Sequence, residues 1–223
     1  YHCATVAQAR ERPMGRGEMA RISEQVYETL KPLVLNADEG TFLSVRKCAT
    51  ELGVSYTPTR EALLRLHTEG LLDLVPNVGF FVTRMDFRTI MSIFQSRECV
   101  EQYVLPKVLD KFDDQDFDFL ERCVEEQRTA IESSDIETYI GVDVEFHCYL
   151  IDKLGNKQLS EFYRTVRSQF RVGSRQITQH HSPVPIDEHT QVIEAVKAGR
   201  HEEAAEIYTQ QCVAAQARRR GAP

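Results

Sequence analysis

The 223-residue sequence predicts a mainly α-helical protein built from two modules. Three observations support this. Apolar residues recur with a helical period along most of the chain, one stretch at residues 71–85 favours a β-hairpin, and the charge is unevenly distributed. Residues 1–85 are electrically neutral, and the later residues carry the whole net charge of −7. A neutral module is therefore expected to precede an acidic one.

The location expected for such a chain is the cytoplasm. No run approaches the ~20 consecutive apolar residues that a membrane span requires. The sequence also shows no pattern of charged, apolar and small residues typical of a secretory signal. We therefore expect a cytoplasmic protein without a membrane partner.

The first module is expected to begin after a flexible tail at residues 1–17, which has no apolar period. A first helix is expected at 18–37 and a second, stopped by a glycine, at 44–53. The apolar stripe of the first helix contains Ile22, Val26, Leu30 and Leu33.

A third helix completes this module. Thr57 is the expected cap, with Pro58 at the first helical position, and the helix is expected to end at Gly70. Short β-prone runs then flank a turn at residues 76–79. Three helices followed by a hairpin predict a winged helix-turn-helix domain over residues 18–85.

The second module is expected to be an all-helical antiparallel bundle over residues 86–220. Strand signals vanish after residue 85, and short polar connections such as "ESSD" separate long amphipathic segments. Such a bundle can enclose a cavity. The helices are expected at 87–112, 115–132, 135–154, 157–180, 185–198 and 200–219.

The start of the third helix carries side chains suited to DNA. In a helix-turn-helix the second helix of the motif enters the major groove by its N-terminal turn. Hydroxyl and guanidinium groups there can bind phosphates and base edges. A capped helix with a solvated arginine explains the same residues equally well. The candidates are Arg46, Ser55, Tyr56, Thr57, Thr59 and Arg60.

This module resembles the N-terminal domain of GntR-family bacterial transcription regulators. The resemblance extends over some sixty residues and includes the run "LGVSYTPTREALLRLHTEGLL" and a wing glycine, Gly79. It implies that Arg46, Ser55, Thr57 and Arg60 contact DNA. It also implies that the wing tip, from Asn77 to Gly79, approaches the minor groove.

Two departures from the family pattern remove positive charge. Tyr56 stands where the family usually has arginine, and the usually basic wing reads "LVPNVG". Each lost phosphate contact weakens DNA binding and flattens its salt dependence. We therefore expect modest intrinsic affinity, with a homodimer on a palindromic operator supplying the rest.

Polar residues occupy the centres of several apolar stripes in the second module. Asp143 and His147 lie about 40° apart on one helical face. His189, Gln211 and Arg97 take similar places on three other helices. An unpaired buried charge is costly, so these groups should satisfy one another, a metal or a ligand.

Simpler explanations exist for each residue alone. A lone histidine on an apolar face is more often a hydrogen-bonded core residue, Arg97 can pair with Glu101, and Gln211 can bond to a carbonyl. Asp143 and His147 are different, because a carboxylate and an imidazole one turn apart can reach one ion. With two donors from other helices they would suit zinc, nickel or a similar divalent metal.

The second module resembles the FCD ligand-binding domain of the FadR-type branch of GntR regulators. The matching segments are "SRECVE", "DVEFHCYLIDKLGN" and "DEHTQVIEAVKAGRHEEAAEIYTQQ". The resemblance implies a metal site of one aspartate and three histidines. Asp143, His147 and His189 fall at three of these positions, and Gln211, a weaker ligand, at the fourth.

The same resemblance implies an acidic effector. Arg97 matches an arginine that can clamp a carboxylate with its planar fork. Arg164, Arg167 and Arg171 repeat at helical spacing, and Arg171 is the second candidate for effector binding, although a solvated face would explain all three.

The predicted function is a DNA-binding transcriptional repressor. A small organic acid, bound at or beside the metal, would change the spacing of the two DNA-binding domains in a homodimer. An alternative keeps the regulator but makes the helical domain a metal-free effector or dimerisation domain. A remote alternative is a metalloenzyme, but the stripes offer no general base beside the metal ligands. We therefore expect a regulator and no enzyme.

Overall fold

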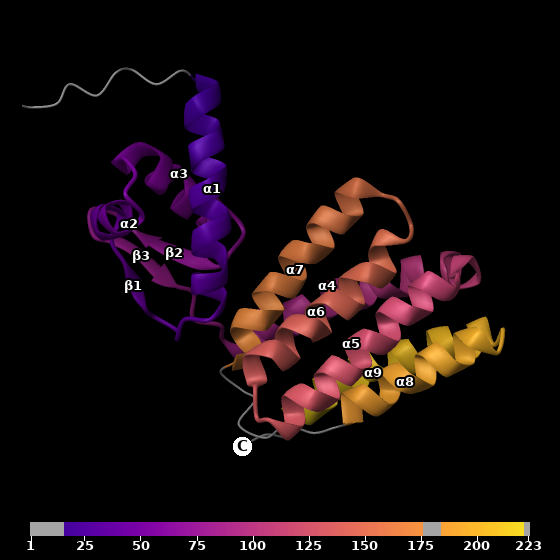
Figure 1. Ribbon diagram of the computed structural model, residues 1–223. Helices are drawn as coiled ribbons and strands as arrows, with labels where there is room; N and C mark the ends of the chain where they lie inside the picture. The colour runs from indigo at the N-terminus through magenta and orange to yellow at the C-terminus, as the bar shows by residue number, and fades with distance from the viewer. Residues whose placement is uncertain (1–15, 176–183, 221–223) are drawn as a thin grey trace, which may run out of the picture.

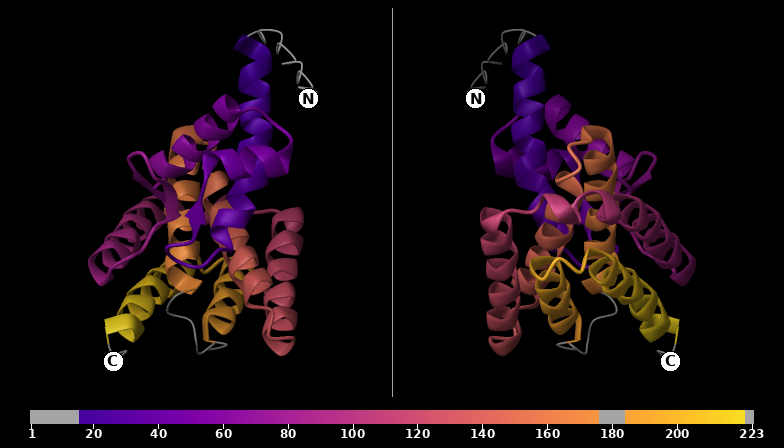
Figure 2. Two further views of the ribbon diagram at one scale, coloured as in Figure 1. Left: turned by 90° about the vertical axis from the view of Figure 1, so that its left-hand side faces the viewer. Right: turned by 90° about the vertical axis from the view of Figure 1, so that its right-hand side faces the viewer.

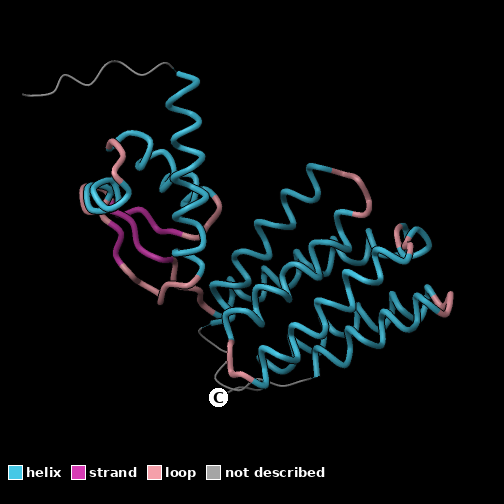
Figure 3. The backbone as a smooth tube through the Cα atoms, in the orientation of Figure 1, coloured by secondary structure: helices cyan, strands magenta, loops and turns pink. Residues whose placement is uncertain are grey.

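The computed structural model of the protein describes residues 16–175 and 184–220, with side chains at 17–172 and 186–210. Two bodies are visible in Figure 1: a smaller one that contains the sheet and the first three helices, and a larger one made of helices. All strands lie in the smaller body (Figure 3). The predicted class, a winged helix-turn-helix joined to a helical bundle, is confirmed.

The smaller body has the order of elements that the sequence predicts, with one strand more. A two-residue strand pairs with the wing, and the sheet order is β1-β3-β2 with antiparallel pairs. A strand of two residues is too short to show an alternating pattern, so it has no signature in the sequence. The elements are α1 (Arg16–Leu35), β1 (Phe42–Leu43), α2 (Val45–Leu52), α3 (Tyr56–Thr68), β2 (Leu72–Val75) and β3 (Gly79–Val82).

The helix-turn-helix has well-defined ends. The hydroxyl of Ser44 accepts from the backbone N–H of Lys47 at the start of α2, and Gly53 ends that helix in the left-handed conformation. The predicted cap of α3 is wrong: the helix begins at Tyr56 and its N-cap is Ser55, without a side-chain cap bond. Pro58 still lies in the first turn, where its missing N–H leaves no helical hydrogen bond unmade.

The larger body consists of helices whose bounds match the predicted segments to within two residues, except at the end of α4. The last residues of the segment predicted at 157–180, from 176 on, lie outside the described part of the chain. The first predicted helix was too long, because α4 stops at Val104 and two 3₁₀ turns, Leu105–Lys107 and Leu109–Lys111, follow. Pro106 lacks a backbone N–H and its ring clashes with a continuing α-helix. The helices are α4 (Phe87–Val104), α5 (Asp114–Glu132), α6 (Ile136–Asp152), α7 (Lys157–Arg175), α8 (Val184–Lys197) and α9 (His201–Arg220).

Helix α7 joins the cores of the two bodies. Val166 and Val172 of α7 and Phe94 of α4 belong to the same buried cluster as the helix-turn-helix core. The side views show α7, in orange, against the N-terminal body (Figure 2). A second cluster lies between α5, α6, α8 and α9. One residue of the predicted apolar stripe of α1 is wrong: Leu33 is 59% exposed, and its neighbour Val34 is buried instead.

Candidate metal centre and nucleic-acid interface

The start of α3 presents most of the predicted DNA-contacting residues to solvent. Tyr56, Thr57 and Arg60 are exposed on its first turns, Arg46 is exposed on α2, and Ser55 is half-buried between the two helices. This helix packs against α1 and α2, which leaves its N-terminal turn uncovered. The arrangement is the one through which helix-turn-helix proteins approach the major groove.

Thr59 is an exception that the structure corrects. Its side chain is fully buried, and its hydroxyl donates to the carbonyl of Ser55 at 3.0 Å. Thr59 therefore stabilises the first turn of α3 from inside, and its hydroxyl cannot reach a phosphate.

The wing contains Asn77 and Gly79, both at positive φ. Asn77 is exposed at the tip with φ of 62°. Gly79 has φ of 152°, and a Cβ there would lie 2.6 Å from a ring carbon of Phe42 and 3.0 Å from the carbonyl oxygen of Leu43. The close approach of β1 explains this glycine, so it shapes the wing from within. Apart from Asn77, the tip exposes apolar side chains, among them Val75 and Val78.

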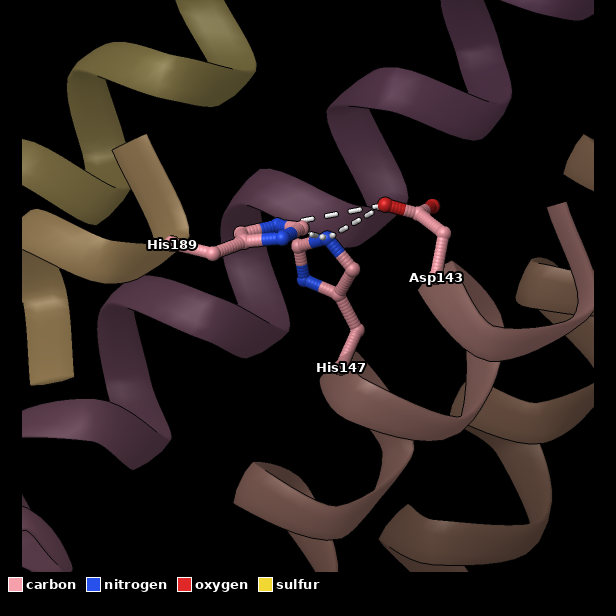
Figure 4. Close-up of side chains that lie close together, drawn as sticks. All are labelled: Asp143, His147 and His189. Atoms are coloured by element: carbon pink, nitrogen blue, oxygen red, sulfur yellow. Dashed lines mark hydrogen bonds and ion pairs between the residues drawn. The ribbon is translucent and has the colours of Figure 1, made fainter. Parts of the chain in front are cut away.

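The helical body brings three of the predicted metal ligands together, as Figure 4 shows. Asp143 and His147 come from α6 and His189 from α8. The two Nε2 atoms lie 3.3 Å apart. Oδ1 of Asp143 lies 3.6 Å from Nε2 of His147 and 3.8 Å from Nε2 of His189. Ligands about 2.1 Å from a tetrahedral ion lie roughly 3.4 Å apart, so the triangle has the size of a zinc-type site.

The other ring nitrogens of both histidines are engaged elsewhere. Nδ1 of His189 faces Oε1 of Gln127 at 3.0 Å, and Nδ1 of His147 contacts the hydroxyl of Tyr208. Since a glutamine oxygen only accepts, Nδ1 of His189 carries the proton and its Nε2 presents a lone pair. Metal-binding histidines are usually oriented by such a second hydrogen bond.

Asp143 is held by its second oxygen. Oδ2 accepts from the Arg167 guanidinium, which leaves Oδ1 facing the histidines. Burial opposes the negative charge, but Arg167 and the two histidines together outweigh it and hold the pKa of the Asp143 carboxyl well below its usual range. The Gln127 amide also donates to Oδ1, at 3.4 Å. The carboxylate is therefore ionised and fixed.

Both imidazoles are neutral near pH 7. Burial lowers the pKa of His189 to about 4, and burial together with Arg167 holds the pKa of His147 well below its usual range. A neutral imidazole and an ionised carboxylate are the forms in which these groups bind a metal.

Three residues of this centre were missed from the sequence: Gln127, Arg167 and Tyr208. Arg167 was one of three arginines at helical spacing, and only its full burial distinguishes it. Gln127 is polar on the apolar face of α5, a signal of the same kind as His189. Tyr208 resembles any core aromatic residue, so only the tertiary contact shows its role.

The two predicted effector arginines lie in different places. Arg97 is buried and its Nε donates to Oε1 of Glu101 at 3.1 Å. Arg171 lies at the junction of the two bodies, where it donates to the amide oxygen of Asn36 at 2.7 Å and faces Glu137. Arg171 is thus placed between domains and not in the polar centre. The side chain of Gln211 lies outside the described residues.

Comparisons with known proteins assign the family. Residues 22–82 match the family described as "Bacterial regulatory proteins, gntR family", and residues 92–212 match the "FCD domain". The chain belongs to the GntR family of transcriptional regulators and carries an FCD domain. The families and the relatives below are regulators and not enzymes, as predicted.

Relatives and solved structures agree with this assignment. An uncharacterized HTH-type transcriptional regulator of Bacillus subtilis, YdhC, is 29% identical over 81% of this chain and 83% of its own length. The Nta operon transcriptional regulator of Aminobacter aminovorans is 33% identical over 55% of this chain and 58% of its own length. The structure of Escherichia coli McbR covers 90% of this chain and 99% of its own with a TM-score of 0.77 and 24% identity, which shows the shared fold.

The helices of this GntR regulator were compared with the length and hydropathy that a membrane span requires. Within the described part of the chain, no helix is long and apolar enough to cross a bilayer.

Proposed function

We propose that this regulator is a repressor whose DNA binding is controlled by a small carboxylate metabolite, bound at or beside a divalent metal. A homodimer would place two copies of α3 on the half-sites of a palindromic operator. The effector would shift the population between dimers that fit the operator and dimers that do not. Its effect is limited by its differential affinity for the two arrangements.

The observation that carries this proposal is the triangle of Asp143, His147 and His189. Three donor atoms converge, and each side chain is fixed by a further partner. Nε2 of His189 presents a lone pair toward Nε2 of His147 at 3.3 Å, a geometry that a cation between the two nitrogens, or a proton on His147, would satisfy. The donor set of two imidazoles and one carboxylate suits zinc or nickel.

A metal in this triangle would offer coordination positions to an acidic ligand. Three protein ligands leave at least one position open, as in catalytic zinc sites. Gln211 on α9 remains the candidate for a fourth protein ligand. An amide oxygen binds such metals more weakly than an imidazole, so an effector oxygen would compete well for its place.

Helix α7 supports a route from this site to the DNA-binding domain. Arg167 holds Asp143, and two residues further on Gln169 donates to the carbonyl of Glu69 at the end of α3, at 2.8 Å. Arg171, one turn beyond Arg167, binds Asn36 just after α1. A shift of Arg167 on effector binding would therefore move the contacts that hold both helices.

Elemental analysis and DNA binding test the proposal together. The native protein should contain about one equivalent of metal per chain, and His189→Gln should lose it. His201→Gln is the matched control, because His201 lies on α9 outside the triangle. A carboxylate metabolite should release the wild-type protein from its operator fragment and have a weaker effect on His189→Gln.

Two results would contradict the proposal at different points. Absence of metal from the native protein, with no tightening on adding zinc or nickel, would leave the metal-free alternative. If the protein shows no preference for any promoter fragment at low salt, including that of its own gene, the proposed binding of α3 to an operator is wrong.

A further inference from the structure

A fully buried glutamine, Gln127, lies beside the metal triangle without belonging to it. Its side chain comes from α5, which packs against both α6 and α8, the helices that carry the three ligands (Figure 1). The neighbouring turns of α5 contribute apolar residues to the core, Val124 and Ala130 among them. An amide in such surroundings is costly unless both of its ends have partners. The partners of Gln127 therefore indicate why a polar residue stands at this position.

The two ends of the amide contact two different ligands of the triangle. Oε1 faces Nδ1 of His189 at 3.0 Å, and the amino nitrogen Nε2 donates to Oδ1 of Asp143 at 3.4 Å. One side chain on α5 thus bridges a ligand on α8 and a ligand on α6. Nε2 of His189 still points into the triangle, toward Nε2 of His147 (Figure 4).

Asp143 decides which way round the amide of Gln127 lies. Arg167 donates to Oδ2 and forms an ion pair with Asp143, so this group is present as a carboxylate whose oxygens only accept. With the amide turned over, Oε1 of Gln127 would face Oδ1 of Asp143, and two acceptors at such close range repel each other. The amino group therefore faces Asp143, and the amide oxygen faces His189.

The amide oxygen of Gln127 in turn decides the tautomer of His189. Because this oxygen only accepts, Nδ1 carries the ring proton and Nε2 keeps its lone pair. The Phe146 ring stacks on His189 with the ring centres 4.1 Å apart, but stacking fixes only the plane of the imidazole. With the amide turned over, its amino group would donate to Nδ1, and the proton of the neutral ring would move to Nε2. A protonated Nε2 cannot bind a metal.

The corresponding contact of His147 imposes no such constraint. Nδ1 of His147 contacts the hydroxyl of Tyr208, which can either donate or accept. Both tautomers of His147 are therefore compatible with this contact. The two histidines of the triangle thus differ, because the contact of His189 with Gln127 selects its metal-binding tautomer and the contact of His147 with Tyr208 selects neither.

We propose that Gln127 is a positioning residue for the metal: it transmits the orientation set by Asp143 to His189 and holds both ligands in their binding forms. This inference rests on the proposed function, since it requires the metal site. It adds to that site a residue that orients two ligands without being a ligand. Ligands that are already oriented need no rearrangement when the metal arrives, so Gln127 should raise the affinity of the site.

The zinc affinity of the full-length protein, measured by competition with a chromophoric chelator, tests this role. Gln127→Met keeps the length of the side chain and removes both hydrogen bonds. We expect it to bind zinc about 10–100-fold more weakly than the wild type, as is usual when a group that orients a metal ligand is removed. Gln115→Met is the control, because Gln115 is exposed on the same helix. It should bind zinc as tightly as the wild type.

The tautomer of His189 is a readout that a merely structural role of Gln127 would not change. Nitrogen NMR of the metal-free protein, labelled in its histidines, distinguishes a ring nitrogen with a proton from one without, and His189→Gln assigns the signal. We expect the proton on Nδ1 in the wild type and a mixture of both tautomers in Gln127→Met. Gln127→Glu should restore the wild-type tautomer, because a carboxylate also accepts from Nδ1. Tyr208→Phe should leave His189 unchanged, because Tyr208 contacts the other histidine.

The outcomes separate this inference from the proposed function. A proton on Nε2 of His189 in the metal-free wild type overturns the role of Gln127, even if the variants do not fold. Equal zinc affinities of Gln127→Met and the wild type overturn it as well. A wild-type protein that binds neither zinc nor nickel contradicts the metal site itself, and with it the role of Gln127 toward a metal, whatever the tautomer of His189.

Discussion

The two bodies of the protein differ in where they keep their polar side chains. Before Asp86, Thr59 is the only buried polar residue among those described, and the core there is apolar. The helical body buries a larger set: Arg97, Glu101, Asp116, Gln127, His147, Arg167, Ser168 and His189.

The difference in size between a DNA duplex and a small metabolite explains this contrast between the two bodies. A DNA duplex cannot enter a domain, so the groups that bind its phosphates and bases must lie on the surface, as Arg46 and Arg60 do. A metabolite can be enclosed, and its site is stronger where water is excluded. Buried charge is costly, so its concentration in one body supports the sensor role that we propose for that body.

The sharpest test of this contrast is the removal of Arg167. In Arg167→Met, Asp143 keeps its burial and loses its charge partner. We expect the free energy of unfolding to fall by about 3–5 kcal/mol in urea, with a chelator present so that no metal compensates. Arg164→Met is the control on the same helix, because Arg164 is 56% exposed. It should cost less than about 1 kcal/mol. Equal losses in the two variants would contradict the importance of burial.

The apolar core of the DNA-binding body should respond through cavity formation. Leu66→Ala truncates a fully buried side chain of α3, and we expect a loss of about 2–5 kcal/mol in the free energy of unfolding. Leu33→Ala, at the exposed position on α1, should change it by less than about 0.5 kcal/mol. A large effect at Leu33 in the isolated protein would show that the measured species buries this face.

A surface arginine should affect DNA binding and leave stability unchanged. Arg60→Ala should weaken operator binding by about 1–3 kcal/mol if Arg60 reads a base, and its unfolding free energy should stay within about 0.5 kcal/mol of wild type. Fluorescence anisotropy at several salt concentrations separates the cases. A change only in the salt slope would assign Arg60 to a phosphate instead.

The smallest expected effect concerns the connection between the bodies. Gln169→Ala removes the hydrogen bond to the carbonyl of Glu69 and should cost about 0.5–1.5 kcal/mol. Effector affinity should remain and the effect of the effector on DNA affinity should decrease. Gln158→Ala, at an exposed position near the start of α7, is the control. Unchanged coupling in Gln169→Ala would exclude this contact as a route.

The sequence determined the elements and the chemistry of their faces. Periodicity located the helices, and the pattern around Pro58 located the start of α3, for which we predict contact with DNA. Polar residues on apolar helical faces identified Asp143, His147 and His189 as a candidate metal site. Local patterns failed where a neighbour in space decides the outcome. Val34 replaced Leu33 in the core, Thr59 turned inward, and Gly79 was required by the approach of β1.

Only the tertiary structure decided which polar groups meet. Asp143 and His147 are four residues apart, so their proximity follows from helical geometry alone. Gln127, Arg167, His189 and Tyr208 reach the same centre from four other helices, and no spacing in the sequence encodes such a meeting. The contacts of Asp143 with Arg167 and Gln127 result from how α5, α6 and α7 pack. Packing is a property of the whole chain, because each helix is placed by the apolar faces of all the others.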